Sequence, residues 1–226
     1  MLLQDKLDAF KANFESGGAP FHAPAAVHEP MRRATAELVA SGLAGNALGV
    51  GDLAPSFELS NAEGVSISSS GLLARGPLVL TFYRGFWCPY CNIELESLQA
   101  ALPAIEARGA TLVALSPQTA ANSRRAKRDK GLSFDILFDS GNEVAASFGL
   151  RFKLPDYLIE LYRDGFDNDL TVTNGDPSWT LPIPARYIID ASGSIAYSEV
   201  NPDYTKRPDP GELLPILDQL KQRTAA

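Results

Sequence analysis

The stretch LVLTFYRGFWCPYC, residues 78–91, decides how this chain is expected to fold. Residues 78–82 form a mostly apolar run that predicts a strand buried on both faces. From Cys88 to about Arg108 apolar residues recur at helical spacing, and Gly109 ends the predicted helix. Pro89 suits the first helical position because it has no N–H to leave unsatisfied. The pattern therefore predicts a strand, a loop and a helix, with Cys88 at the N-terminus of the helix.

The sequence on either side of this stretch alternates between predicted strands and helices. Short alternating runs at 57–59 and 65–67 indicate a hairpin, and residues 150–180 are less regular, with a helix expected at 154–162. The other predicted elements are strands at 111–116, 134–138, 185–190 and 194–200, and helices at 120–130, 143–148 and 212–223. Crossover helices give parallel strands, whereas the tight turn at 191–193 gives an antiparallel pair. This order predicts an α/β protein with a thioredoxin-like fold, in which helices flank a central mixed sheet.

The first 48 residues have a different sequence pattern from the rest. They predict a helical N-terminal arm ahead of a main domain at 49–226. Leu3, Leu7, Phe10 and Phe14 share one helix face. A second helix is expected at about 31–41, after a Pro/Ala-rich stretch. The arm has too few apolar residues for a core of its own. It must pack on the main domain or on a second subunit, and we expect the second, in a possible homodimer.

Composition and charge exclude several classes of partner. The 226 residues carry a net charge of −7, with a pI near 4.9, which disfavours nucleic acid and anionic membranes. Basic residues at 124–130 are interpreted as a solvated helix face. No apolar run approaches the ~20 residues of a spanning helix, and the charged start is unlike a secretory signal, so we expect a cytoplasmic protein. His22 and His28 are the two histidines, and we expect no metal and no cofactor.

The two cysteines, Cys88 and Cys91, lie together in a CPYC motif. Two cysteines three residues apart close no long loop, so a stabilising disulfide is a poor explanation and redox chemistry is the better one. The helix N-terminus favours a negative sulfur at Cys88, and the thiolate is the reactive form. Cys91 follows one turn later, close enough for a disulfide. Trp87 and Tyr90 flank the pair and are candidates for an apolar, substrate-binding mouth.

At these residues the chain resembles the peroxiredoxin-like proteins of the alkyl hydroperoxide reductase/thiol-specific antioxidant family, in the thioredoxin superfamily. The resemblance covers roughly residues 50 to 220. It is carried by four segments: GDLAPSFEL (51–59), LVLTFYRGFWCPYC (78–91), FDILFDSGNEVAASFGL (134–150) and PARYIIDASGSIAYS (184–198). It implies a thioredoxin-like fold and a peroxidatic Cys88.

The sequence departs from this family at three positions. Typical members have Pro seven residues and Thr or Ser three residues before the peroxidatic cysteine, where this chain has Thr81 and Gly85. They also have an arginine before the late strand, where this chain has Pro184. We expect Arg84, four residues before Cys88, to supply the missing cation. We also expect Pro184 to follow a cis bond and to face the cysteines, as the corresponding proline does in thioredoxin-like oxidoreductases.

The resemblance implies a thiol peroxidase that reduces hydrogen peroxide or organic hydroperoxides. Cys88 would become a sulfenic acid, and Cys91 would condense with it to form a disulfide. Thioredoxin or a glutaredoxin-type reductant would then reopen the disulfide. Two alternatives stay open. The CPYC motif and Pro184 fit a thiol–disulfide oxidoreductase that acts on protein disulfides, and a redox-switched binding protein is a third possibility.

Overall fold

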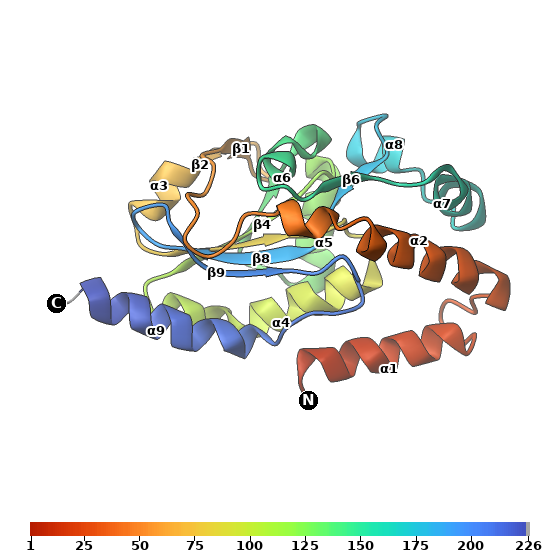
Figure 1. The fold of residues 1–226 in the computed structure, drawn as a ribbon, viewed down its shortest axis with the longest axis horizontal. Coiled ribbons are helices and arrows are strands. Elements are labelled where there is room, and N and C mark those ends of the chain that lie inside the picture. Colours follow the sequence, from red (N-terminus) through yellow and green to blue (C-terminus); the bar gives the residue numbers. More distant parts are fainter. Residues whose placement is uncertain (225–226) are drawn as a thin grey trace.

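The computed structural model describes residues 1–224 and has a five-stranded mixed sheet at its centre (Figure 1). The strand order is β5-β4-β3-β8-β9, with β3 parallel to β4, β4 parallel to β5, and β8 antiparallel to both of its neighbours. The strands are β3 (Leu78–Phe82), β4 (Thr111–Ser116), β5 (Asp135–Phe138), β8 (Ala185–Ile189) and β9 (Ile195–Val200). The predicted α/β class and thioredoxin-like arrangement are confirmed.

Strand β3 lies in the middle of this sheet and is buried along its whole length. Val79 points into a core shared with α4 (Pro89–Glu106), whereas Leu78 and Leu80 point to the opposite face. Each residue of β3 is paired on both sides; Leu80, for example, lies opposite Val113 of β4 and Tyr187 of β8. This two-sided burial explains why residues 78–82 read as an apolar run rather than as alternating polar and apolar residues.

Helices cover both faces of the sheet. In Figure 1, α4 and α9 lie on one side, and α3 and α6 on the other. Helix α5 also packs against the sheet, with Ala126 in the same core as α4. The helices are α3 (Ser69–Leu73), α5 (Ala120–Lys130), α6 (Glu143–Ser147) and α9 (Leu213–Thr224), and the predicted hairpin is β1 (Glu58–Ser60) with β2 (Ser66–Ser68).

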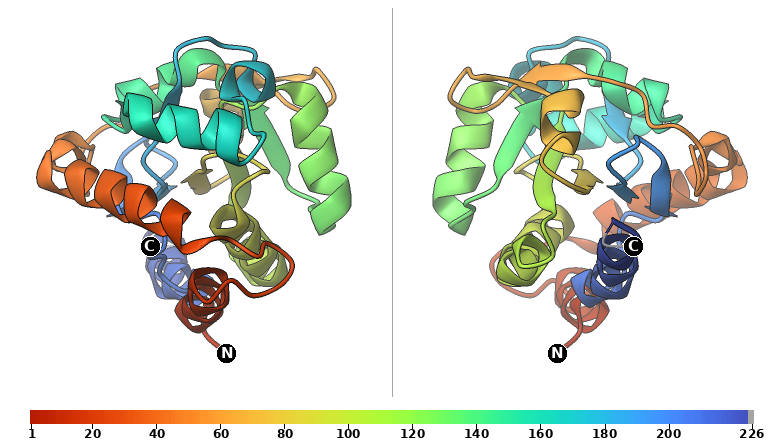
Figure 2. Two further views of the ribbon diagram at one scale, coloured as in Figure 1. Left: turned by 90° about the vertical axis from the view of Figure 1, so that its right-hand side faces the viewer. Right: turned by 90° about the vertical axis from the view of Figure 1, so that its left-hand side faces the viewer.

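The N-terminal arm consists of α1 (Leu3–Glu15), α2 (His28–Ala40) and short 3-10 turns at Ala25–Val27 and Leu43–Asn46. Helix α1 packs against α4 of the same chain and shares a hydrophobic core with residues of α9 (Figure 2). Leu3 and Leu7 are buried there in the core, at 1% and 0% exposure. These two side chains are therefore not available for the subunit contact that we expected, because their apolar surface is already covered within the chain.

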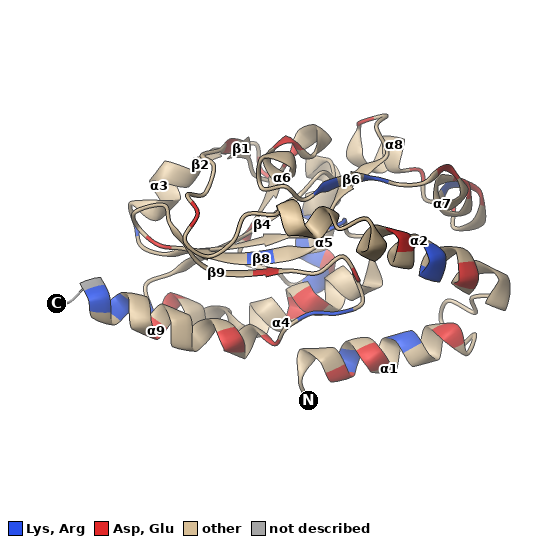
Figure 3. Ribbon diagram, viewed as in Figure 1, with Lys and Arg blue, Asp and Glu red and all other residues tan. Residues whose placement is uncertain are grey.

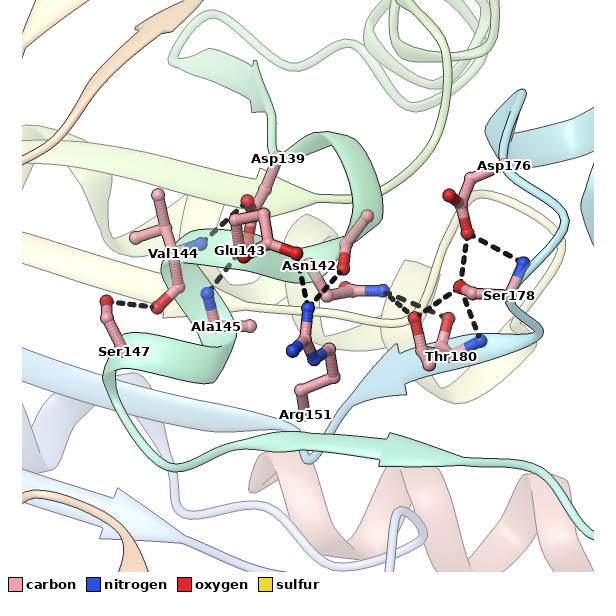
Figure 4. A network of polar contacts seen from close by, with 11 residues as sticks. Asp139, Asn142, Glu143, Val144, Ala145, Ser147, Arg151, Asp176, Ser178 and Thr180 are labelled. Atoms are coloured by element: carbon pink, nitrogen blue, oxygen red, sulfur yellow. Dashed lines mark hydrogen bonds and ion pairs between the residues drawn. The ribbon is translucent and has the colours of Figure 1, made fainter.

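The segment between α6 and β8 contains more regular structure than the sequence indicated. Its elements are β6 (Arg151–Lys153), α7 (Asp156–Glu160), a π-helical turn at Leu161–Gly165, α8 (Leu170–Asn174) and β7 (Thr180–Pro182). Polar contacts hold it in place (Figure 4): the Asp139 carboxylate accepts the N–H groups of Val144 and Ala145 at 2.9 Å each, and the Asn142 amide donates to the Thr180 carbonyl at 3.0 Å. These contacts join the end of β5 to β7, which leads into β8.

Charged residues of both signs are interspersed on the outer helices α1 and α9 (Figure 3). Most basic residues of α5 are paired with acidic ones: Lys130 lies 2.9 Å from Glu96, and Lys127 lies 3.6 Å from Asp135. Arg124 instead donates to the Ala62 carbonyl at 2.6 Å. This pairing agrees with the interpretation of the cluster as a solvated helix face. Among residues 1–224, no helix is long and apolar enough to cross a membrane.

Candidate active site

The loop between β3 and α4 has a fixed conformation that begins at Gly85. This residue has φ +149°, and a Cβ atom there would lie 2.4 Å from Nε1 of Trp87. The indole therefore occupies the space of the side chain that typical family members carry at this position. The Phe86 N–H donates to the Gln118 side chain at 2.7 Å, and the Asn92 amide donates to the Phe86 carbonyl at 2.7 Å. These contacts hold the loop that places Cys88 at the start of α4.

Cys88 and Cys91 are free thiols one helical turn apart. Cys88 is the N-cap residue of α4 and Pro89 is the first helical residue, as the sequence predicted. The Cys91 thiol donates a hydrogen bond to the Cys88 sulfur at 3.0 Å. Both side chains are buried, with exposures of 1% and 0%. The pair is therefore close enough to form a disulfide with only a small movement.

The two thiols differ sharply in acidity. Burial opposes ionisation of Cys88, but the hydrogen bond from Cys91 and the charges of Arg84 and Arg207 outweigh it and lower the pKa of Cys88 to about 6. Burial, together with the hydrogen bond and charge at Cys88, raises the pKa of Cys91 well above its usual value. Near neutral pH the pair therefore holds one negative charge, and that charge lies on Cys88.

Arg84 lies beside Cys88, at the position where a cation was expected. Its side chain is buried, and its guanidinium lies 4.2 Å from the ring centre of Tyr204 and 4.9 Å from that of Trp87. It also donates a hydrogen bond to the Tyr162 hydroxyl. Its Nε has no hydrogen-bond partner among residues 1–224. Aromatic rings thus hold this cation close to the thiolate without neutralising it.

A second charged group near the cysteines was missed by the sequence analysis. Glu94 of α4 is buried between two arginines: Arg186 of β8 donates to it at 2.7 Å, and Arg207 donates to its other oxygen at 2.7 Å. Two cations and one anion leave an excess positive charge, and Arg207 lowers the pKa of both Cys88 and Cys91. One signal was present in the sequence, because Glu94 lies three residues after Cys91 on the apolar face of the helix.

A cavity of about 350 Å³ opens at Cys88 and has a mostly aromatic lining. Trp87 and Tyr90, the two residues expected at a substrate mouth, both line it, together with Arg84. Volumes of this size and an apolar lining with few polar groups are typical of small-molecule sites. The cavity therefore gives a ligand of moderate size access to the Cys88 sulfur.

Pro184 lines a neighbouring cavity of about 430 Å³, which shares Arg84 and Tyr204 with the first. The expected cis bond before Pro184 is wrong, because the cis peptide bond within residues 1–224 is Ala19–Pro20. The chain runs extended from β7 into β8: the Ile183 N–H donates to the Leu150 carbonyl at 2.8 Å, and the Pro184 carbonyl accepts from Asn201 at 3.3 Å. A trans bond suits this straight path.

A thiolate at the start of a helix, paired with a second thiol on a thioredoxin-like sheet, defines a thiol-based oxidoreductase. Residues 50–198 match the AhpC/TSA family, and the chain belongs to that family. The family match begins after the arm.

Similar proteins include a peroxiredoxin and a thiol–disulfide oxidoreductase, and a solved structure shares the fold. The chain is similar to "Peroxiredoxin Q, chloroplastic" of Triticum aestivum, at 25% identity over 92% of this chain and 83% of the relative. It is also similar to "Thiol-disulfide oxidoreductase ResA" of Bacillus thuringiensis (strain Al Hakam), at 26% identity over 51% of this chain and 65% of the relative. The crystal structure of peroxidoxin BcpB from Mycobacterium tuberculosis shares the fold, with a TM-score of 0.60 and 19% identity over 77% of this chain and 97% of the other.

Proposed function

We propose that the protein is a thiol peroxidase that reduces hydroperoxides at Cys88. The observation that carries the proposal is a Cys88 thiolate, with a pKa of about 6, in the wall of an apolar cavity. The thiolate attacks the terminal oxygen of the peroxide, so that an S–O bond forms and the O–O bond breaks. The leaving alkoxide, or hydroxide in the case of hydrogen peroxide, takes up a proton. Cys88 becomes a sulfenic acid.

Cys91 resolves this sulfenic acid. Burial is the largest cause of the raised pKa of Cys91, and the hydrogen bond and charge at Cys88 add to it. Once Cys88 carries no negative charge, its contribution to the raised pKa of Cys91 is removed, while Arg84 and Arg207 still favour a thiolate. The Cys91 sulfur then forms an S–S bond with Cys88, and the sulfenic oxygen leaves as water after it takes up a proton. A dithiol reductant of the thioredoxin or glutaredoxin type supplies the two electrons that reopen the disulfide. Membership of the AhpC/TSA family supports this cycle.

A thiol–disulfide oxidoreductase is the second candidate, and the similarity to ResA together with the CPYC motif favours it. Its substrate would be a disulfide in another protein, which must bring a sulfur against the attacking thiolate. Cys88 and Cys91 are almost fully buried, whereas the cavity beside them has the size of a small molecule. This geometry favours the peroxidase.

Two activity measurements distinguish the peroxidase, the thiol–disulfide oxidoreductase and the redox-switched binding protein. Peroxide consumption is measured with thioredoxin, its reductase and NADPH, and reduction of insulin disulfides is measured in parallel. We expect rapid peroxide consumption by the wild type, none by Cys88→Ser, and a single oxidation that stops at a sulfenic acid in Cys91→Ser. A sulfenic-acid probe that labels Cys91 in an active Cys88→Ser variant would reverse the assignment of roles. Rapid insulin reduction without peroxide turnover would support the oxidoreductase, and neither activity would leave the binding protein.

A further inference from the structure

The cavity at Cys88 has one wall that comes from the N-terminal arm. Phe10 and Phe14 of α1 and Phe21 of the following loop all line it. The three rings contact one another, with centroid distances of 6.1 Å for Phe10–Phe14, 5.6 Å for Phe10–Phe21 and 5.9 Å for Phe14–Phe21. They form an aromatic wall, which we call the arm wall and define as Phe10, Phe14 and Phe21.

The arm wall is joined to the residues around the nucleophile. The Phe10 ring packs edge-on against Tyr90 at 4.9 Å, and Tyr90 is two residues from Cys88. In Figure 1 the arm helices lie at the end of the molecule where α4 begins. Trp87 and Tyr162, whose ring centres are 5.3 Å apart, also line the cavity and form a second aromatic surface. A molecule in the cavity would therefore meet two aromatic surfaces as well as the Cys88 sulfur.

Charged groups in this cavity are few, and one of them, Arg84, acts on the Cys88 sulfur. Of the described residues that line it, Arg84 is the one cation and Asp167 the one carboxylate. Arg84 is buried and retains an unpartnered Nε, so it can donate to a peroxide oxygen held at Cys88. The remainder of the lining offers dispersion and apolar contact to whatever is attached to the peroxide.

From this geometry we propose that the arm wall makes the protein selective for bulky apolar hydroperoxides, such as aryl-substituted ones, over hydrogen peroxide. The inference rests on the proposed peroxidase function and adds a substrate class and three specificity-determining residues. Hydrogen peroxide has no apolar group, so the arm wall gives it no binding energy. An aryl group would fill the space between the two aromatic surfaces and hold the terminal oxygen at Cys88.

The arm wall can be changed without changing the residues that carry out the chemistry at the sulfur. The family match covers residues 50–198, whereas the arm wall lies entirely before it. None of its three residues supplies a charge or a hydrogen bond among the causes that lower the pKa of Cys88. A change in the arm wall should therefore alter which peroxide is preferred and leave the acidity of the thiol as it is.

The test compares two substrates in the full-length protein. We would measure kcat/KM for cumene hydroperoxide and for hydrogen peroxide in the wild type, Phe14→Ala and Phe21→Ala, with Leu2→Ala as the control. Leu2 also belongs to the arm, is 62% exposed and is not part of the cavity. Phe21 is 47% exposed, so its removal should leave the fold intact, and Phe14→Leu keeps an apolar side chain if Phe14→Ala unfolds.

We expect the ratio of the two kcat/KM values, cumene hydroperoxide over hydrogen peroxide, to fall about tenfold or more in the arm-wall variants. The loss should appear as a higher KM for cumene hydroperoxide, while the control ratio and the iodoacetamide pH profile of Cys88 stay unchanged. A ratio that is unchanged, or equal losses with both peroxides, would overturn the selectivity. A wild type that consumes neither peroxide would instead overturn the proposed function and, with it, this inference.

Discussion

The two sides of Cys88 are built from different parts of the chain and by different physical means. On one side lie buried charges from the part of the chain that follows the arm, with Glu94 held between Arg186 and Arg207. On the other side the arm contributes the aromatic rings of the arm wall, which carry no charge. Arg84 lies at the boundary, within the cavity and against aromatic rings. Charges on one side thus set the pKa of the Cys88 thiol, and the arm wall on the other side shapes the path by which a molecule reaches it.

Because of this difference, the reactivity of the thiol and the recognition of its substrate can vary independently in such a protein. Charge acts on the sulfur over several ångströms, whereas an apolar wall acts only through contact. A change on the charged side should therefore move the pKa of the thiol, and a change in the arm should move stability or substrate preference. Substitutions on each side of Cys88 can test this separation.

The first prediction concerns the anchoring of the arm. Leu7→Ala removes a fully buried side chain between α1 and the core and should lower the free energy of unfolding by about 2–5 kcal/mol, because it leaves a cavity. Urea unfolding would measure the loss. Leu2→Ala, on an exposed side chain of the same arm, should change stability by less than about 0.5 kcal/mol. Equal effects of the two substitutions would show that the arm does not depend on this contact.

The second prediction concerns the charged side. Arg84→Ala removes a cation that lowers the pKa of Cys88 and should raise that pKa from about 6 by about 1–3 units. Near pH 7 the fraction of thiolate, and with it the oxidation rate, would fall by up to about 100-fold. The pH profile of iodoacetamide alkylation measures the shift. Arg33→Ala, an exposed arginine of α2 that lies outside the site, is the matched control. An unchanged profile in Arg84→Ala would remove this residue from the site.

Much of the central fold could be predicted because local and global signals agree there. The strand at 111–116 and the helix at 120–130 have the bounds that the sequence indicated. The buried run at 78–82 and the proline after Cys88 fixed the strand, the helix and the placement of the nucleophile together. A helix was predicted at 154–162, and α7 lies within it. The other short elements between 150 and 182 were less accessible to prediction, since no periodic pattern marks them and contacts between distant segments hold them, such as the Asn142–Thr180 hydrogen bond.

The charged cluster could not be predicted for a different reason. Glu94 and Arg207 are 113 positions apart, and they meet only because the chain returns beneath α4 after β9. The arm was predicted as helices, but where it packs depends on the shape of the surface that α4 presents to α1, which a helical spacing does not specify. The cis bond at Pro184 was inferred from a resemblance, and the backbone of this chain follows a straight extended path instead.

The smallest effect is expected at Glu199 of β9, which lies opposite Arg186 in the strand register. Burial raises the pKa of Glu199 to about 7; Glu94 and Glu212 add to the rise, and Arg207 and Arg186 only partly offset it. A folded-state pKa above the unfolded value means that the folded protein loses stability as pH rises from about 4.5 through 7.

Glu199→Gln keeps the shape of this side chain and removes its titration, so it should stabilise the protein at pH 8 by about 1–2 kcal/mol and have little effect at pH 4. Thermal unfolding at the two pH values would show this as a rise in Tm of a few degrees at the higher pH alone. Leu7→Ala provides the contrast, because an apolar contact does not titrate and its cost should be similar at both values. A stabilisation by Glu199→Gln that did not depend on pH would mean that Glu199 is not ionised against a burial cost. The pH dependence that distinguishes the two sides would then rest on Cys88 itself, whose pKa Arg84 and Arg207 lower.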